Sequence, residues 1–165
     1  MIKNILKIMD RSIEITIAII FILMVVVGGM QVFNRFILNQ SLSWSEEFQK
    51  FAHIWIVFLT IPVAYNRGAH IGMGVLFNKF PQKLQNWIKF GFDLIWFIFS
   101  LALIVYTLRI MEVTQNQHSA GIGIRMDYVY FGLLIGGVYL LIIAIRKIIE
   151  KIRHQMTLKS GEVPC

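Results

Sequence analysis

Residues 13–33 have the sequence IEITIAIIFILMVVVGGMQVF, in which Glu14 is the one charged side chain. A helix needs about 20 mostly apolar residues to cross a hydrocarbon core of roughly 30 Å, and this run has that length. It is longer than the apolar core of a secretory signal, which has about 7–15 residues, and no small-residue cleavage site follows it. The run therefore predicts a retained transmembrane helix.

Further apolar runs follow this one, and they define the fold class. We predict an all-α membrane protein with four transmembrane helices in a single domain over residues 1–155, followed by a flexible tail at 156–165. The predicted spans lie at about residues 13–33, 48–65, 88–108 and 128–145.

The connections between the spans differ in character. Residues 66–80 fit neither a helical nor a strand period, and we expect an amphipathic segment at the membrane surface between the second and third helices. Pro81 is expected as the first residue of the third helix. The polar stretch 109–125 has no helical period and predicts an exposed loop. Ser43 and Glu46 fit a capping box at the start of the second helix.

Composition excludes several classes of protein. The chain is 57% hydrophobic and 15% charged, against about 45–50% and 25% in soluble domains. The net charge of +7 comes from Lys and Arg residues beside the apolar runs, where they anchor and orient helices, so no nucleic-acid binding is expected. The one cysteine, Cys165, allows neither a disulfide framework nor a cysteine metal site within the chain. We expect no cofactor and no enzymatic activity.

The basic residues also predict an orientation. The N-terminal tail, the second connection and the C-terminal tail hold 12 of the 16 Lys and Arg residues. Short cytoplasmic segments carry this excess in membrane proteins. Both termini are therefore expected in the cytoplasm.

Few polar side chains fall inside the predicted spans, and each is a candidate site because burying an ionisable group in a membrane is costly. Asp93 lies four residues after Lys89, which favours a local ion pair over an ion or proton site. His53 is the one histidine within a span, and a bis-histidine haem would need a second on a facing helix, so a polar contact to a neighbouring helix is favoured. Gly132 and Gly136 form a G-x-x-x-G face that can pack within the chain or against a partner.

The most distinctive motifs lie between residues 33 and 71. They are Phe33-Asn34-Arg35-Phe36, Ser43-Trp44-Ser45-Glu46-Glu47, Trp55, Phe58-Leu59, Ala64, Arg67 and His70-Ile71. In these motifs, and in its length and number of spans, the chain resembles the small membrane subunit of tripartite ATP-independent periplasmic (TRAP) transporters. The resemblance implies a bacterial inner-membrane protein that braces a large, elevator-type membrane subunit and works with a periplasmic substrate-binding protein. It also implies sodium-driven import of an organic acid, such as sialic acid or a C4-dicarboxylate.

The resemblance places two groups of candidate interface or structural residues on opposite sides of the membrane. Arg35, Ser43, Trp44, Glu46, Glu47 and Lys50 would lie on the periplasmic side. There, Glu46 and Lys50 have the spacing of a helical ion pair, and Arg35 is in reach of Glu47 across the loop. Arg67 and His70 would lie on the cytoplasmic side, against lipid headgroups or a subunit.

Two other functions compete with the scaffold hypothesis. A small homodimeric multidrug exporter also has four helices and needs an embedded carboxylate for proton exchange, for which Asp93 is the candidate. A membrane anchor of a redox enzyme would bind haem. The predicted spans contain no Arg or Lys near the midplane and no matching pair of broken helices. Both features are expected of a chain that transports an organic anion by itself, so independent transport is disfavoured.

Overall fold

Four long helices make up the described part of the chain. The computed structural model describes residues 2–68 and 81–160, and within them no β-strand is present. The helices are α1 (Ile2–Phe36), α2 (Ser43–Asn66), α4 (Gln82–Thr114) and α5 (Met126–Ser160). Each is long and apolar enough to cross a membrane. The prediction of an all-α protein with four spans is confirmed.

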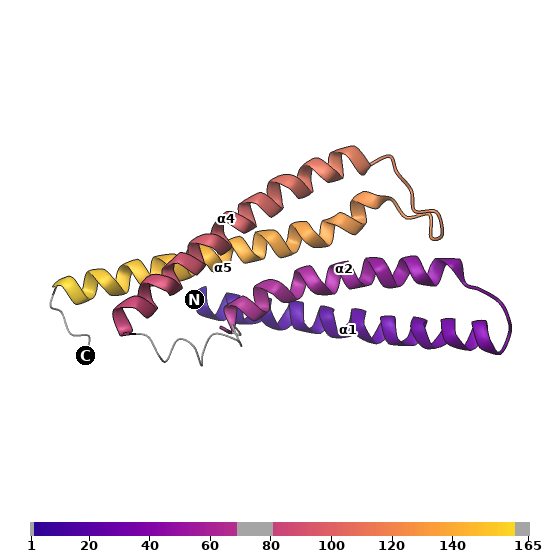
Figure 1. The fold of residues 1–165 in the computed structure, drawn as a ribbon, viewed down its shortest axis with the longest axis horizontal. Helices are drawn as coiled ribbons and strands as arrows, with labels where there is room; N and C mark the ends of the chain where they lie inside the picture. Colours follow the sequence, from indigo (N-terminus) through magenta and orange to yellow (C-terminus); the bar gives the residue numbers. More distant parts are fainter. Residues whose placement is uncertain (1, 69–80, 161–165) are drawn as a thin grey trace.

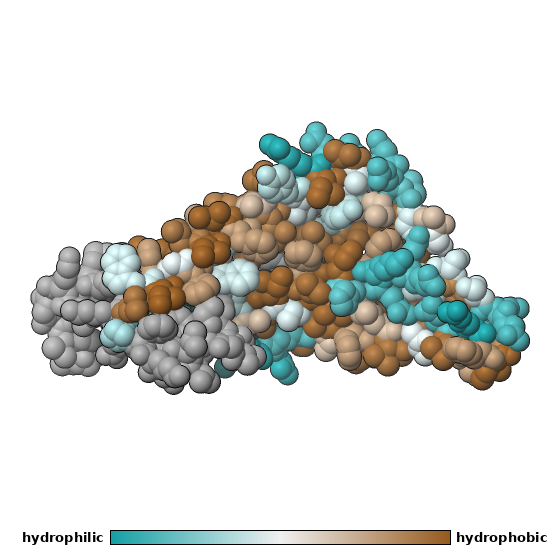
Figure 2. Space-filling view, viewed as in Figure 1, coloured by the Kyte–Doolittle hydropathy of each residue, from teal (hydrophilic) through white to brown (hydrophobic). Residues whose placement is uncertain are grey.

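The helices lie side by side as a layer (Figure 1). Their main contacts join α1 to α2, α2 to α5, and α5 to α4, so α1 and α4 form the two edges. Successive helices run in opposite directions, which brings the start of α1 and the end of α5 to the same end of the layer. This arrangement leaves both faces of the layer exposed, and Figure 2 shows broad hydrophobic surface on one of them.

The core of the layer is formed between α2 and α5, near the end where the chain termini lie. Its buried side chains are Val63, Tyr65, Tyr139, Leu140, Ile143 and Ala144, with Trp96 and Phe97 of α4 packed against them. In the membrane such packing draws on van der Waals contact, since lipid is as apolar as the side chains themselves.

Glycines allow α5 to approach both of its neighbours closely. A Cβ atom added at Gly132 would lie 2.8 Å from the ring of Trp55, and one at Gly136 would overlap the backbone of Phe58, both on α2. Gly137 faces Leu103 and Ile104 of α4. Small residues permit this backbone approach. The G-x-x-x-G face therefore packs within the chain.

Two predicted helix starts were wrong by one position. Leu42, and not Ser43, precedes the first residue of α2, and no side chain caps this end. Ser43 is already the first helical residue, so its side chain is not in the capping position. The hydroxyl of Ser45 donates to the Leu42 carbonyl at 2.7 Å. Pro81 is the residue before α4, with an extended backbone, and its carbonyl accepts from the amides of Leu84 and Gln85.

All four helices extend past the predicted spans, and the extensions of α4 and α5 change the predicted connections. α4 continues to Thr114, so the predicted loop 109–125 shortens to 115–125. The residues that α4 gains include Ile110, Met111 and Val113, and the Thr114 hydroxyl donates to the Ile110 carbonyl at 2.7 Å within the last turn. α5 continues to Ser160, beyond the predicted domain end at residue 155. The predicted surface segment 66–80 lies outside the described residues apart from its first three.

Candidate functional site

Asp93 is the centre of a polar cluster that joins three helices. Asp93 lies on α4, and only 5% of its surface is exposed. The Tyr65 hydroxyl of α2 donates to Asp93 Oδ1 at 2.7 Å, and Lys151 of α5 forms an ion pair with Oδ2. The sequence predicted Lys89 as the partner of Asp93 and did not identify Tyr65 or Lys151. Those two residues are distant from Asp93 in the sequence and meet it only when the helices pack. The cluster gives a buried carboxylate the paired and hydrogen-bonded surroundings that it requires.

Lys147 adds a second contact to Tyr65. Its ammonium donates to the Tyr65 carbonyl oxygen and lies 3.9 Å from the centroid of the Tyr65 ring. Tyr65 is in the last turn of α2, and its carbonyl oxygen also accepts from the Gly68 amide at 3.2 Å. The helix dipole favours a cation at this end, so Lys147 of α5 adds a charged donor to the end of α2.

A neighbouring set of contacts holds α1 to the layer. Asp10 accepts a hydrogen bond from the Tyr139 hydroxyl of α5 and another from Asn66 Nδ2 of α2 at 2.5 Å. Glu14 pairs with Arg11 of the same helix at 3.9 Å, and it also pairs with Arg67, the residue that follows α2. The pair with Arg67 joins α1 to the end of α2.

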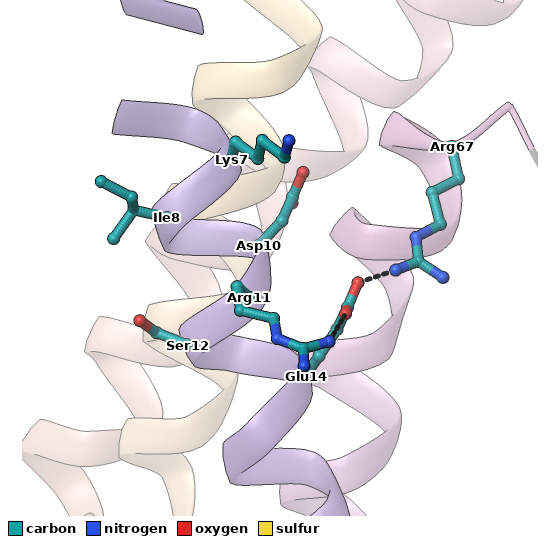
Figure 3. Close-up of a pocket in the computed structure, with 7 residues that line it drawn as sticks. All are labelled: Lys7, Ile8, Asp10, Arg11, Ser12, Glu14 and Arg67. Carbon is teal, nitrogen blue, oxygen red and sulfur yellow. Dashed lines mark hydrogen bonds and ion pairs between the residues drawn. The ribbon is translucent and has the colours of Figure 1, made fainter. Parts of the chain in front are cut away.

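An open pocket of about 770 Å³ lies beside these contacts (Figure 3). It is lined by Lys7, Ile8, Asp10, Arg11, Ser12, Glu14 and Arg67. Figure 3 shows Arg11 and Arg67 both directed at Glu14, and the other carboxylate, Asp10, is held by Tyr139 and Asn66. The pocket lies at the end of α1 and not at its middle, which separates it from the position expected of a transport site.

At the other end of the layer, Glu47 of α2 holds the loop between α4 and α5. Glu47 Oε2 accepts from the Ser119 hydroxyl, from the Gly121 amide at 2.9 Å and from the Ile122 amide at 3.2 Å. A Cβ at Gly121 would lie 3.0 Å from the same oxygen. The turn of the loop places these donors close together, and a carboxylate accepts such a group of hydrogen bonds well.

The predicted pair between Arg35 and Glu47 is absent from the described contacts, since Glu47 is turned toward the loop. The predicted pair of Glu46 with Lys50 is also missing from the ion pairs of residues 2–68 and 81–160; both side chains are exposed. His53 is likewise exposed and makes no hydrogen bond within those residues. His70 lies outside the described residues.

The remaining predicted residues are at the surface. Arg35, Ser43 and Trp44 are exposed, Trp44 at 36%, while Arg67 is exposed and paired with Glu14. Sequence reasoning missed the tyrosine, asparagine and lysine partners of the polar cluster. A signal for several of them was present in the placement of Tyr65, Asn66, Lys147 and Lys151 near span ends, but aromatic and basic residues there are also typical of membrane anchoring.

Within the described residues, no three His, Cys, Asp or Glu side chains lie close enough to hold a metal ion. The charged groups at both ends serve contacts between helices and with the loop. The arrangement is thus suited to holding the helices in a fixed layer.

Known proteins similar to this chain identify its family. The sequence profile of the DctQ component of tripartite ATP-independent periplasmic transporters matches residues 15–154. A TRAP transporter small permease protein of Haemophilus influenzae is 26% identical over 152 residues, covering 92% of this chain and 94% of that protein. The sialic acid TRAP transporter small permease protein SiaQ of Vibrio cholerae is 22% identical over 159 residues, covering 96% and 90%.

A third relative shows how such subunits are partnered. The sialic acid TRAP transporter permease protein SiaT of Haemophilus influenzae is 24% identical over 103 residues, which cover 62% of this chain and 17% of that protein. A region like this chain is there one part of a longer permease. The present chain therefore belongs to the family of TRAP transporter small membrane subunits, which partner with a large permease, and it is a multi-pass inner-membrane protein.

Proposed function

We propose that this chain is the non-catalytic scaffold subunit of a sodium-coupled TRAP transporter, and that it braces the large elevator-type subunit that carries substrate and sodium. The observation that carries the proposal is the layer itself. Its long helices are unbroken over the described residues, whereas transporters bind substrate at broken helices near the midplane. The charged groups of the cluster serve as ties between helices.

The proposal includes an orientation and a docking role. With both termini in the cytoplasm, the end that contains Glu47 and the loop 115–125 faces the periplasm. The loop is held to α2 through Glu47, so it offers a surface of fixed shape to the periplasmic substrate-binding protein. Arg67 then faces the cytoplasmic headgroups of membrane lipids.

The proposed substrate is an organic acid of the sialic acid or C4-dicarboxylate class. Two of the similar proteins are named for sialic acid, at 22% and 24% identity. Those identities support a class of substrate and not a single compound, since in this proposal the residues that bind substrate belong to other chains.

Deletion of this chain from cells that contain the large subunit tests the scaffold role. We expect sodium-driven uptake of the organic acid to be lost and to return when the chain is supplied on a plasmid. A pull-down of the tagged chain from mild detergent should recover the large subunit in fixed proportion. Full uptake by the large subunit alone would contradict the proposal.

The exporter hypothesis has lost its main support. A proton-exchanging carboxylate must be free to release its proton and bind a cation, whereas Asp93 is engaged by Lys151 and Tyr65. Membership in the TRAP family also argues against it. An Asp93→Asn chain that assembles should still support organic acid uptake, and loss of uptake in a fully assembled complex would reopen the question.

A further inference from the structure

One face of α2 carries polar side chains along the membrane span. We name this face the α2 stripe, and it consists of the polar residues Glu46, Lys50, His53 and Thr60 together with the apolar Val57. The alternating spacing of four and three residues places them on one side of the helix. All five are exposed. The most apolar 18 residues of α2 also have a lower mean hydropathy than those of the other three helices, 1.3 against 2.1 to 2.6.

Contacts with α1 show how deep this stripe lies. Gln49 Nε2 donates to Gln31 Oε1 at 2.8 Å, and a Cβ at Gly28 would lie 3.5 Å from the same nitrogen. Gly28 is five residues inside the end of the apolar run at Phe33. Because α2 runs antiparallel to α1, His53 lies about one turn deeper, roughly 13 Å inside that end at 1.5 Å per residue.

A second register gives a shallower depth. Trp55 packs against Gly132, five residues after the Asp127 that marks the polar start of α5. His53 lies two residues nearer than Trp55 to the start of α2, which puts it roughly 5 Å inside the level of Asp127 at 1.5 Å per residue. The two registers together place the imidazole within the apolar span, roughly 5 to 13 Å from its outer end.

His53 is the member of the stripe that lipid cannot satisfy. The Thr60 hydroxyl donates to the Ile56 carbonyl at 2.7 Å, and the long stem of Lys50 allows its ammonium to reach the surface. The imidazole has no such route and no hydrogen bond within residues 2–68 and 81–160. Histidines within membrane spans almost always face protein or a water-filled cavity, because exposure to lipid is costly.

We propose that the α2 stripe is the surface that binds the large membrane subunit, and that a helix of that subunit presents hydrogen-bond acceptors to His53 and Lys50. This inference rests on the proposed function, and it adds the face through which the bracing occurs. Figure 2 agrees with it: hydrophilic surface crosses the part of the molecule where Figure 1 draws the N-terminal half of α2, with hydrophobic surface on either side.

Charge complementarity selects the occupant. A second copy of this chain with the same orientation would meet the stripe about a two-fold axis along the membrane normal. That pairing brings the Lys50 ammonium groups of the two copies together, and it offers each His53 imidazole no acceptor other than a second imidazole. A different chain can offer carboxylate or carbonyl groups at these positions, and the large permease is the partner of this family.

Site-specific photocrosslinking in membranes that contain the complete transporter tests the surface. A photoreactive residue is placed at His53 or Val57 on the α2 stripe, and at Ile22 of α1 or Ile98 of α4 as matched exposed controls. We expect crosslinks to the large subunit from the stripe and lipid adducts from the controls. Crosslinks from Ile22 or Ile98 but not from the stripe, or crosslinks between two copies of this chain at His53, would overturn the inference.

Two substitutions at His53 test the polar contact itself. His53→Leu should reduce the apparent affinity for the large subunit roughly fivefold, the loss of one interhelical hydrogen bond. His53→Gln, which keeps a donor, should restore most of it. Unchanged or tighter binding by His53→Leu would contradict the inference.

Recovery of the unmodified complex by affinity tag separates the two levels of the argument. If tagged wild-type chain recovers no large subunit, the proposed function fails. If it recovers the large subunit while crosslinks map to another face, the scaffold role stands and the assignment of the α2 stripe is wrong.

Discussion

The most apolar 18 residues of α1 and of α5 are nearly equal in mean hydropathy, 2.6 and 2.3, yet the two helices differ in position, α1 at an edge of the layer and α5 inside it. None of the apolar window of α1 is buried within the chain, whereas 44% of that of α5 is. In water, two helices this apolar would both have to be buried. In a membrane they need not be, because lipid satisfies apolar side chains as well as protein does.

The difference comes instead from small residues and polar contacts. On α5, Gly132, Gly136 and Gly137 all face neighbouring helices closely. On α1, a Cβ at Gly29 would meet nothing within 4 Å. Equivalent changes on the two helices should therefore have unequal effects, and four predictions follow that order from the largest to the smallest.

The largest effect is expected from Gly136→Ala. The added methyl group would overlap the backbone of Phe58, which cannot move as a flexible side chain could, so α2 and α5 must separate. We expect a loss of about 3 kcal/mol in stability, at the upper end for overpacking. Thermal unfolding of the detergent-solubilised chain, followed by size-exclusion chromatography, measures the loss.

Gly29→Ala is the matched control for this change. It has open space around it and should be neutral or stabilising by up to about 1 kcal/mol, because alanine favours helix. Equal losses from both glycines would show that the close approach of α5 to α2 does not exist.

The second effect concerns the polar cluster. Asp93→Asn removes the charge that pairs with Lys151 while keeping an acceptor for Tyr65, and we expect a loss of about 2 kcal/mol. Lys151→Met should lose a similar amount, and the double variant should lose less than the sum of the two. The same unfolding assay measures all three.

An exposed pair on α5 provides the control. Arg146 and Glu150 form an ion pair at 2.9 Å with Glu150 56% exposed, so Glu150→Gln should cost about 0.5 kcal/mol or less. Strict additivity of Asp93→Asn and Lys151→Met would contradict the direct contact between them.

The third effect is local and concerns the loop 115–125. Glu47→Gln weakens the three hydrogen bonds to Ser119, Gly121 and Ile122, and protease cleavage within the loop should become several-fold faster. Glu46→Gln changes the neighbouring exposed carboxylate and should leave the cleavage rate unchanged. Cleavage that rises equally in both variants would count against the Glu47 contact.

The sequence predicted the number and order of the spans, because apolar length is set by the thickness of the membrane. It could not predict that Asp93 contacts Lys151, since spacing along one helix suggests Lys89 and says nothing of another helix. The same limit applies to Glu47, whose partners are backbone amides that no side-chain pattern reveals. It predicted a G-x-x-x-G face at Gly132 and Gly136 but could not choose between α2 and a partner protein as the surface against which it packs.

The smallest effect is expected on α1, at Ile19→Ala. This side chain is 53% exposed and faces lipid in the isolated chain, so its loss leaves no cavity within the protein. We expect a change within about 0.5 kcal/mol in the unfolding assay and no change in recovery of the large subunit, because Ile19 is not part of the α2 stripe. If Ile19→Ala instead weakened recovery of the large subunit while the isolated chain kept its stability, the α1 edge would be a binding surface too. The contrast between a lipid-facing α1 and a buried α5 would then hold for the isolated chain but not for the assembled transporter.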